Sequence, residues 1–133
     1  EGEVDEAGGA CAMGRLLPRV RQGLTAVYAI NDPMALGALR VLREAGLRVP
    51  EDISLAACDD IPVAAQVQPA LTTVWQPKGE LGTEAARLLL AQIQARGERG
   101  EGGKVHYPFQ SALFHPRLVV RESTSPRPPP LSR

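Results

Sequence analysis

Four polar or aromatic residues follow or end short runs of apolar residues, and together they could grip a small molecule. They are Asn31, Asp59, Trp75 and Gln76. Carboxylate and amide groups exchange hydrogen bonds with hydroxyl groups, and an indole face packs against an apolar ring. We therefore predict that these four residues bind a polar small molecule, without covalent chemistry.

Two of the polar positions also suit a purely structural role. Asn31 and Asp60 each stand shortly before a proline, where a side-chain oxygen caps the free amides of a first helical turn. If Asp60 caps a helix, the neighbouring carboxylate of Asp59 is left over and must be solvated, paired or bound to a ligand. Asp59 is therefore the strongest candidate for a ligand contact.

The elements that position these residues alternate between strands and helices. Short apolar runs predict buried strands, and segments with apolar residues three or four apart predict helices. The strands are expected at 24–30, 53–58 and 71–75, and the helices at 33–45, about 61–67 and 79–96. This order predicts an α/β fold with a parallel sheet flanked by helices. Ligands bind at the carboxyl ends of such strands, where the four residues lie.

The two ends of the chain give weaker patterns. Residues 6–17 have helical spacing, but three glycines weaken the helix, and we expect it to end near Pro18. Further strands are expected at 106–114 and 118–121. Residues 123–133 are rich in proline and serine, which predicts a disordered tail.

Composition and motifs argue against several classes of function. Fifteen basic and fifteen acidic residues balance, so there is no global attraction to nucleic acid or to a membrane. Neither hydrolase nor phosphate-loop motifs occur, and His106 and His115 lie away from the strand ends. Cys11 and Cys58 have no metal-binding spacing and are expected as free thiols in the core, which suits the cytoplasm. We expect no catalytic residue, no metal site and no cofactor.

Several longer motifs resemble the sensor region of the LacI/GalR family of bacterial transcriptional regulators. In chain order they are AINDPMALGALR at 29–40, EAGLRVPEDIS at 44–54, DDIP at 59–62, PALTTVWQP at 69–77 and PRLVVREST at 116–124. The resemblance implies a partial periplasmic-binding-protein-like (type I) fold. It also implies that Asn31 and Asp59 face a sugar or nucleobase-like effector, with Gln76 at a crossover between two lobes.

The same resemblance implies a domain organisation and partners. Residues 1–122 would form a partial effector-sensor domain, with its main lobe at 23–76, the helix at 79–96 belonging to an otherwise missing first lobe, and the tail at 123–133. The full-length parent would be a homodimer, and it would contact DNA only through an N-terminal head that is missing here. The expected dimer interface consists of Met34, Leu36, Ile61, Val63 and Val67.

A missing lobe would leave one helix without its usual partner. The apolar residues of this helix would then be partly exposed, and the chain would be marginally stable, aggregation-prone or dimeric. These residues are Leu81, Ala85, Leu88, Leu89 and Ile93. Two other functions stay open at this point: a fragment of a periplasmic-type solute-binding protein, and a small α/β enzyme that uses Asp59 and Asp60.

Overall fold

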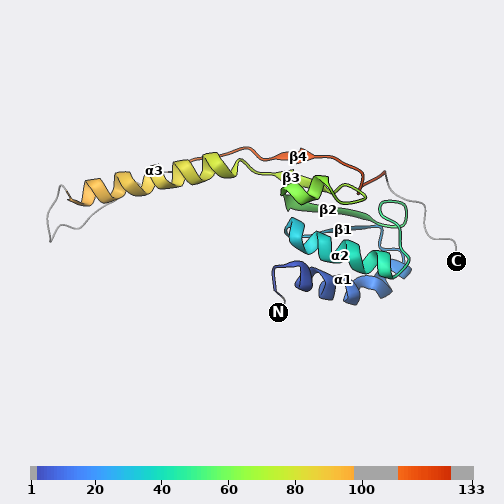
Figure 1. Cartoon of the computed structure of the whole chain (residues 1–133). Coiled ribbons are helices and arrows are strands. Elements are labelled where there is room, and N and C mark those ends of the chain that lie inside the picture. Colours follow the sequence, from blue (N-terminus) through green and yellow to red (C-terminus); the bar gives the residue numbers. More distant parts are fainter. Residues whose placement is uncertain (1–2, 98–110, 127–133) are drawn as a thin grey trace. The chain divides into compact units, whose positions relative to one another are not determined.

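The computed structural model describes residues 3–97 and 111–126 (Figure 1). It divides the chain into two compact units. The first unit comprises Glu1–Trp75 and Arg117–Arg133, and the second comprises Gln76–Pro116. Within the described residues, the first unit holds the sheet and two of the three α-helices.

A mostly parallel sheet forms the centre of the first unit. Its strands β1 (Ala26–Tyr28), β2 (Ser54–Asp59), β3 (Thr72–Trp75) and β4 (Arg117–Val119) lie side by side in this order. The first three are parallel, and β4 is antiparallel to β3. This confirms the predicted α/β fold. The antiparallel strand has a simple cause, because β3 leads the chain into the second unit and β4 leads it back.

The two predicted late strands differ from the structure. The strand expected at 118–121 is β4, which begins one residue earlier and ends at Val119. Most of the strand expected at 106–114 lies outside the described residues, and residues 111–114 have no regular secondary structure.

Two helices pack on the same side of the sheet in Figure 1. Helix α1 (Glu6–Arg21) begins at Asp5, whose Oδ1 accepts a hydrogen bond from the Gly8 amide at 2.8 Å. Helix α2 (Asp32–Glu44) ends just before Gly46, whose φ of 73° is one that glycine adopts readily. Between β2 and β3, the 3-10 helix η1 (Pro62–Ala65) replaces the longer predicted helix.

Helix α1 continues past Pro18, where the sequence predicted its end. Met13 and Val20, which lie on either side of the proline, are both buried in the core. Their burial compensates for the one hydrogen bond that proline cannot donate. Tertiary packing therefore extends the helix beyond the end that local preference predicts.

Glycines bring α1 and α2 into backbone contact. A Cβ on Gly37 would lie 1.9 Å from the carbonyl oxygen of Glu6, and a Cβ on Gly9 would lie 2.1 Å from that of Met34. No side chain fits at such distances. Gly9, which we expected to weaken α1, therefore allows the two helices to pack closely.

The two faces of the sheet differ in how they are covered. Val27 and Leu55 are register partners and share the face that packs against the helices, where Leu55 is fully buried. Tyr28 points to the opposite face, where it is 61% exposed, and Leu118 of β4 is exposed to the same extent. Among the described residues of the first unit, the helices therefore cover one face of the sheet.

The segment after β4 is folded, which corrects the predicted start of the tail at residue 123. The Ser123 hydroxyl is buried, accepts a hydrogen bond from the Thr72 amide at 2.8 Å and donates one to the Leu55 carbonyl at 2.5 Å. Thr124 shares a hydroxyl–hydroxyl hydrogen bond of 2.9 Å with Thr72. The rest of the predicted tail, from 127 onwards, lies outside the described residues.

Helix α3 (Lys78–Gly97) is the main element of the second unit. Leu81, Ala85, Leu89 and Ile93 are exposed and Leu88 is half-buried, which confirms the predicted exposure of its apolar stripe. The expected effect on stability stays a prediction. Neither cysteine forms a disulfide, but Cys11 lies on the surface of α1 rather than in the core as expected, and Cys58 is half-buried.

The close contact of α1 and α2 gives a testable prediction. We expect Gly37→Ala to lower the free energy of unfolding by about 1–3 kcal/mol, because the new methyl group pushes two backbones apart. Gly14→Ala is the matched control, since Gly14 lies in α1 with open space around its Cα. It should be stabilising by about 0.5–1 kcal/mol through helix propensity alone. Urea denaturation followed by circular dichroism measures both, and equal stability of the two variants would contradict the packing.

Candidate functional site

Three of the four predicted ligand-binding residues lie at the carboxyl edge of the sheet. Asp59 ends β2 and Trp75 ends β3, and their Cα atoms are register partners. Asn31 follows β1, which is parallel to both. Gln76 is the first residue of the second unit, so its convergence with the others stays a prediction.

Asn31 caps helix α2, so the structural interpretation of this residue is confirmed. Its Oδ1 accepts a hydrogen bond from the Met34 amide at 2.9 Å, and its Nδ2 donates one to the Val4 carbonyl at 3.2 Å. An amide oxygen has a second lone pair, and an amide nitrogen carries a second hydrogen. Asn31 therefore retains the capacity for one further bond at each atom.

Asp32 is the buried polar centre of this edge, and the sequence analysis missed it. It is 0% exposed. One carboxylate oxygen accepts a hydrogen bond from the Ile61 amide at 2.8 Å, and the other accepts one from the Thr73 hydroxyl at 2.6 Å. These partners lie 29 and 41 residues further along the chain, so no local pattern could have revealed them.

Asp60 does not cap the following helix, which corrects the sequence-based interpretation. The residue before η1 is Ile61, and it makes no side-chain capping bond. The Asp32 carboxylate takes the Ile61 amide instead, and Asp60 forms an ion pair of 2.6 Å with Arg121. The two side chains are only 16% and 18% exposed, so the pair is largely shielded from water.

The backbone at the end of β2 adopts an unusual conformation. Asp59 has φ of 125° and Asp60 has φ of 51°, which are both values that non-glycine residues rarely adopt. Such a conformation costs about 1–3 kcal/mol per residue and persists only where its surroundings hold it. We call residues 59–61 the acidic turn. The acidic turn contains Asp59, the strongest ligand-binding candidate, and it is held by the contacts of Ile61 with Asp32 and of Asp60 with Arg121.

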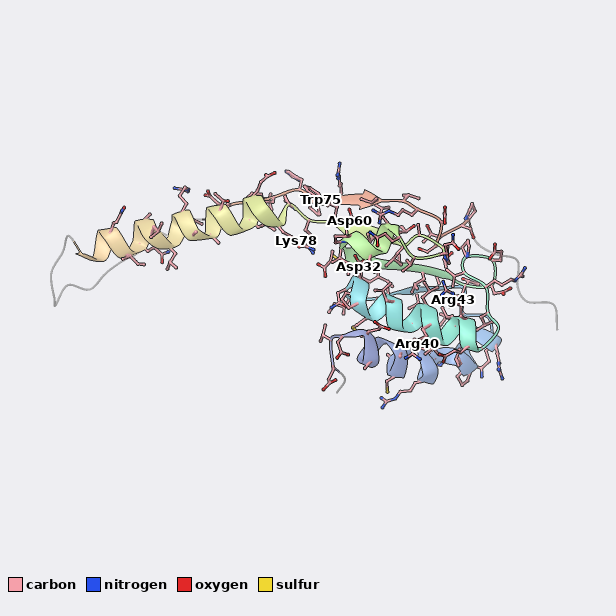
Figure 2. All side chains as sticks on the ribbon, viewed as in Figure 1. Asp32, Arg40, Arg43, Asp60, Trp75 and Lys78 are labelled. Carbon is pink, nitrogen blue, oxygen red and sulfur yellow. The ribbon has the colours of Figure 1, made fainter. Side chains whose placement is uncertain are left out.

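Figure 2 shows Asp32, Asp60 and Trp75 gathered at the same end of the first unit. The guanidinium of Arg117, the register partner of Trp75 on β4, lies 4.6 Å from the centre of the indole ring. This cation–π contact occupies one face of the ring. An apolar ligand surface would therefore have to use the other face or the edge.

Tyr28 adds a hydroxyl group close to this edge, and the sequence analysis did not select it. Partial desolvation raises the pKa of its phenol, followed by the nearby Cys58 thiol and the negative charges of Asp59 and Asp32. The phenol is therefore protonated at neutral pH and can donate a hydrogen bond. In the sequence it lies inside the apolar run at 24–30, and no local pattern distinguished it from a buried strand residue.

The remaining chemistry of the described residues is limited. Within residues 3–97 and 111–126, no three histidine, cysteine or acidic side chains gather as a metal ion would require. In the same part of the chain, no helix has the length and apolarity needed to span a bilayer. The edge thus offers acceptors, a phenol donor and an aromatic ring, which suit the recognition of a hydroxylated ligand.

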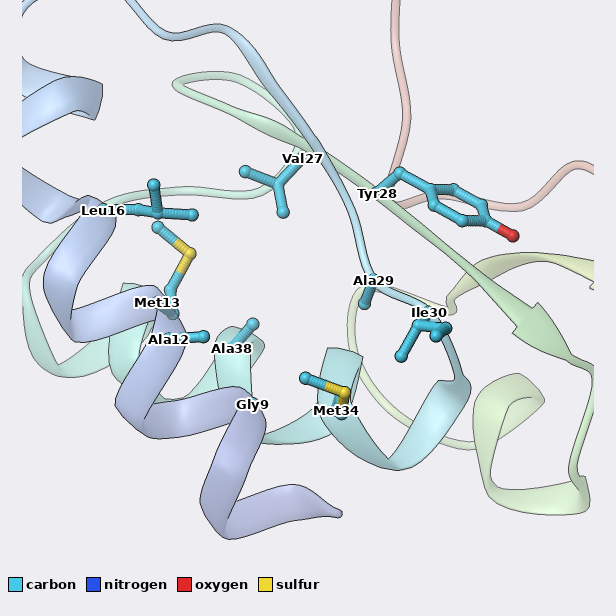
Figure 3. A pocket seen from close by; sticks show the side chains of 10 residues that line it. All are labelled: Gly9, Ala12, Met13, Leu16, Val27, Tyr28, Ala29, Ile30, Met34 and Ala38. Atoms are coloured by element: carbon cyan, nitrogen blue, oxygen red, sulfur yellow. The ribbon is translucent and has the colours of Figure 1, made fainter. Parts of the chain in front are cut away.

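The five residues of the predicted dimer interface are all half-buried, but one stands apart. Met34 lines an apolar pocket of about 280 Å³ between α1 and β1 (Figure 3). Leu36 lies about 200° further around α2, on the opposite flank. That flank faces residues 61–68, because Arg43, two turns along, donates a hydrogen bond to the Gln68 carbonyl. Leu36, Ile61, Val63 and Val67 can therefore share one surface that excludes Met34.

Residues 2–124 match the family model of the periplasmic binding protein-like domain. The chain is 44% identical over 124 residues to the HTH-type transcriptional regulator GalR of Escherichia coli, with 93% of this chain and 33% of that protein covered. The chain thus spans about a third of the length of the curated relatives it matches.

Solved structures with bound sugars are also similar to this chain. A LacI family transcriptional regulator from Enterococcus faecium with bound ribose has a TM-score of 0.74 and 34% identity, over 92% of this chain and 41% of that chain. The transcriptional regulator CelR, in its complex with cellobiose, has a TM-score of 0.78 and 39% identity, over 92% of this chain and 34% of that chain.

The buried carboxylate of Asp32 gives the prediction for this site. We expect Asp32→Asn to lower the free energy of unfolding by about 1–3 kcal/mol, because an amide nitrogen cannot accept from Ile61 or Thr73 and leaves a buried donor unpaired. The control is Glu44→Gln, which removes an exposed ion pair with Arg40 and should cost about 0.2–1 kcal/mol or less. Urea denaturation measures both, and an equally small loss in both variants would show that the Asp32 contacts do not hold the fold.

Proposed function

This chain belongs to the periplasmic binding protein-like domain family, in the LacI/GalR group that its motifs predicted. We propose that it senses a small hydroxylated effector, most simply a sugar, for a transcriptional regulator. The proposal rests on the position of Asp59 and Trp75, which are register partners on neighbouring parallel strands at the carboxyl edge of the sheet. A carboxylate beside an indole ring suits a sugar, which has hydroxyl groups around an apolar ring face.

The proposed binding residues are Asn31, Asp59, Trp75 and Gln76, with the phenol of Tyr28 as a further donor. Asn31 keeps spare hydrogen-bonding capacity beyond its capping role. Two similar regulators were solved with sugars, one with ribose and one with cellobiose. These ligands belong to those proteins, and for this chain they serve as the first probes.

The proposed mechanism is a ligand-linked shift between conformations, and no covalent bond is made or broken. An effector changes a conformational equilibrium only by binding one state more tightly than the other. In this proposal, the shift in conformation changes how DNA-binding segments outside this chain bind DNA. The relatives are named as HTH-type transcriptional regulators, which supports this direction of signalling.

Binding of the effector can be followed with the single tryptophan of the chain, Trp75. We expect a saturable change in its fluorescence on titration with ribose, cellobiose or adenine. Asp59→Asn should weaken the affinity by roughly ten- to a hundredfold, because hydrogen bonds to a charged group contribute about 1.5–3 kcal/mol.

Glu44→Gln is the control for this titration, since Glu44 lies on the exposed surface of α2 and pairs with Arg40. It should leave the affinity unchanged. Affinity that is equal in the Asp59→Asn variant and the unaltered chain would overturn the assignment of Asp59. A chain that responds to none of the three probes at millimolar concentration would count against the proposed function itself.

We also propose that the chain forms a homodimer through Leu36, Ile61, Val63 and Val67. Val63→Asp places a charge in this half-buried apolar surface and should convert dimers to monomers in sedimentation velocity. Leu113→Asp is the control, because Leu113 is 85% exposed in the second unit and lies far along the chain from the surface. A monomeric unaltered chain, or a dimer that survives Val63→Asp, would contradict this interface.

A further inference from the structure

We propose that Arg121 is a positioning residue of the effector site, which holds the acidic turn in the conformation that presents Asp59. This inference rests on the proposed function and extends it, because Arg121 lies outside the set of predicted ligand contacts. It also assigns a role to the segment after β4, whose end the sequence had suggested was disordered.

The acidic turn needs an external support. Its first two residues both have positive φ values, and neither is a glycine. Three contacts oppose the relaxation of this backbone. The Asp32 carboxylate accepts from the Ile61 amide at 2.8 Å, the Thr73 hydroxyl accepts from the Asp60 amide at 3.4 Å, and Arg121 holds the Asp60 carboxylate at 2.6 Å.

Arg121 is the only cation among these three supports, and it is itself well anchored. Its Nη1 donates to the Leu71 carbonyl at 2.8 Å while its Nη2 donates to Asp60. Its backbone amide donates to the Thr72 hydroxyl at 2.9 Å. The guanidinium therefore bridges the beginning of β3 and the end of β2. The planar fork of arginine reaches two acceptors at once, which the single ammonium of lysine does with less geometric control.

The ion pair also has the burial that makes its geometry matter. Exposed pairs contribute little, because water and salt screen them and both side chains move. Both partners here are less than a fifth exposed, so removal of Arg121 leaves a shielded carboxylate without its counter-charge. Movement of Asp60 toward water relieves that charge, and it displaces the neighbouring Asp59 as well.

The segment 117–121 thus contacts both ends of the proposed site. Arg117 lies over the ring of Trp75, and Arg121 holds the residue next to Asp59. Asp59 and Trp75 are register partners, so the two arginines act on neighbouring ligand candidates. In this proposal the segment 117–121 sets the distance between the Asp59 carboxylate and the Trp75 indole, in addition to extending the sheet through β4.

The test compares Arg121→Gln with Asp60→Asn, their double variant and the conservative Arg121→Lys. Arg87→Gln is the matched control, because it removes an arginine–carboxylate pair on the exposed surface of α3. The first measurement is hydrogen exchange of individual amides without ligand. We expect exchange of the Asp60 and Ile61 amides to rise roughly tenfold or more in Arg121→Gln, and amides in α1 to be unaffected.

The second measurement is affinity for ribose or cellobiose by Trp75 fluorescence. We expect Arg121→Gln to weaken the affinity for the sugar roughly tenfold. A loss of this size is typical when a residue that orients the ligands of a metal site is removed. The double variant should bind the sugar no more weakly than Arg121→Gln does, since each single change already removes the same Arg121–Asp60 ion pair. Arg121→Lys should restore part of the affinity. A purely structural arginine would lower the unfolding midpoint and leave the affinity of the folded protein unchanged, which would overturn the proposal.

The two measurements separate the failure of this proposal from that of the proposed function. If the unaltered chain binds neither sugar, the proposed effector class is wrong, and the exchange experiment alone decides the role of Arg121. Unchanged exchange at Asp60 and Ile61 in Arg121→Gln overturns the positioning role, whatever the sugars do. A rise that also occurs in Arg87→Gln would overturn it too.

Discussion

The buried carboxylate of Asp32 is the constraint on which the rest of this structure depends. A charge enters a protein interior only when its hydrogen bonds are replaced, and here an amide and a hydroxyl from two other elements replace them. Asp32 also lies in the first turn of α2, where the helix dipole favours a negative charge. The start of α2, the acidic turn and β3 are thereby fixed relative to one another, and this defines the carboxyl edge of the sheet.

The four residues of the motifs Asn31-Asp32 and Asp59-Asp60 have different roles at this edge. Asn31 caps the helix, Asp32 braces the interior, and Asp60 pairs with Arg121. Asp59 is the member of the set to which we assign the ligand. In the sequence, both motifs follow a predicted strand and stand shortly before a proline, which predicts a helix cap in each. In the structure, only the first motif caps a helix with its side chain. Similar local patterns therefore serve different physical purposes, according to which distant partner reaches them.

The sequence predicted the elements of this fold well because they follow from local periodicity. The three parallel strands, α2 and α3 lie within a few residues of their predicted positions. What it missed depends on partners far along the chain: Asp32, the Asp60–Arg121 pair and buried Ser123 all have partners between 29 and 68 residues away. Gly9 of α1 was misleading for the same reason, since it allows close contact with α2 although it lowers helix propensity.

The geometry of the candidate site therefore depends on a part of the chain that follows the second unit. After β3 the chain enters that unit, and it returns through the segment 117–121, which carries Arg117 and Arg121. A ligand that prefers one spacing of Asp59 and Trp75 must also prefer one arrangement of β3 and this segment. By linkage, any partner that binds one of these arrangements more tightly changes the affinity for the ligand, and the ligand changes the affinity for that partner by the same factor. The two arginines of the segment 117–121 are therefore the contacts through which this segment acts on the candidate site.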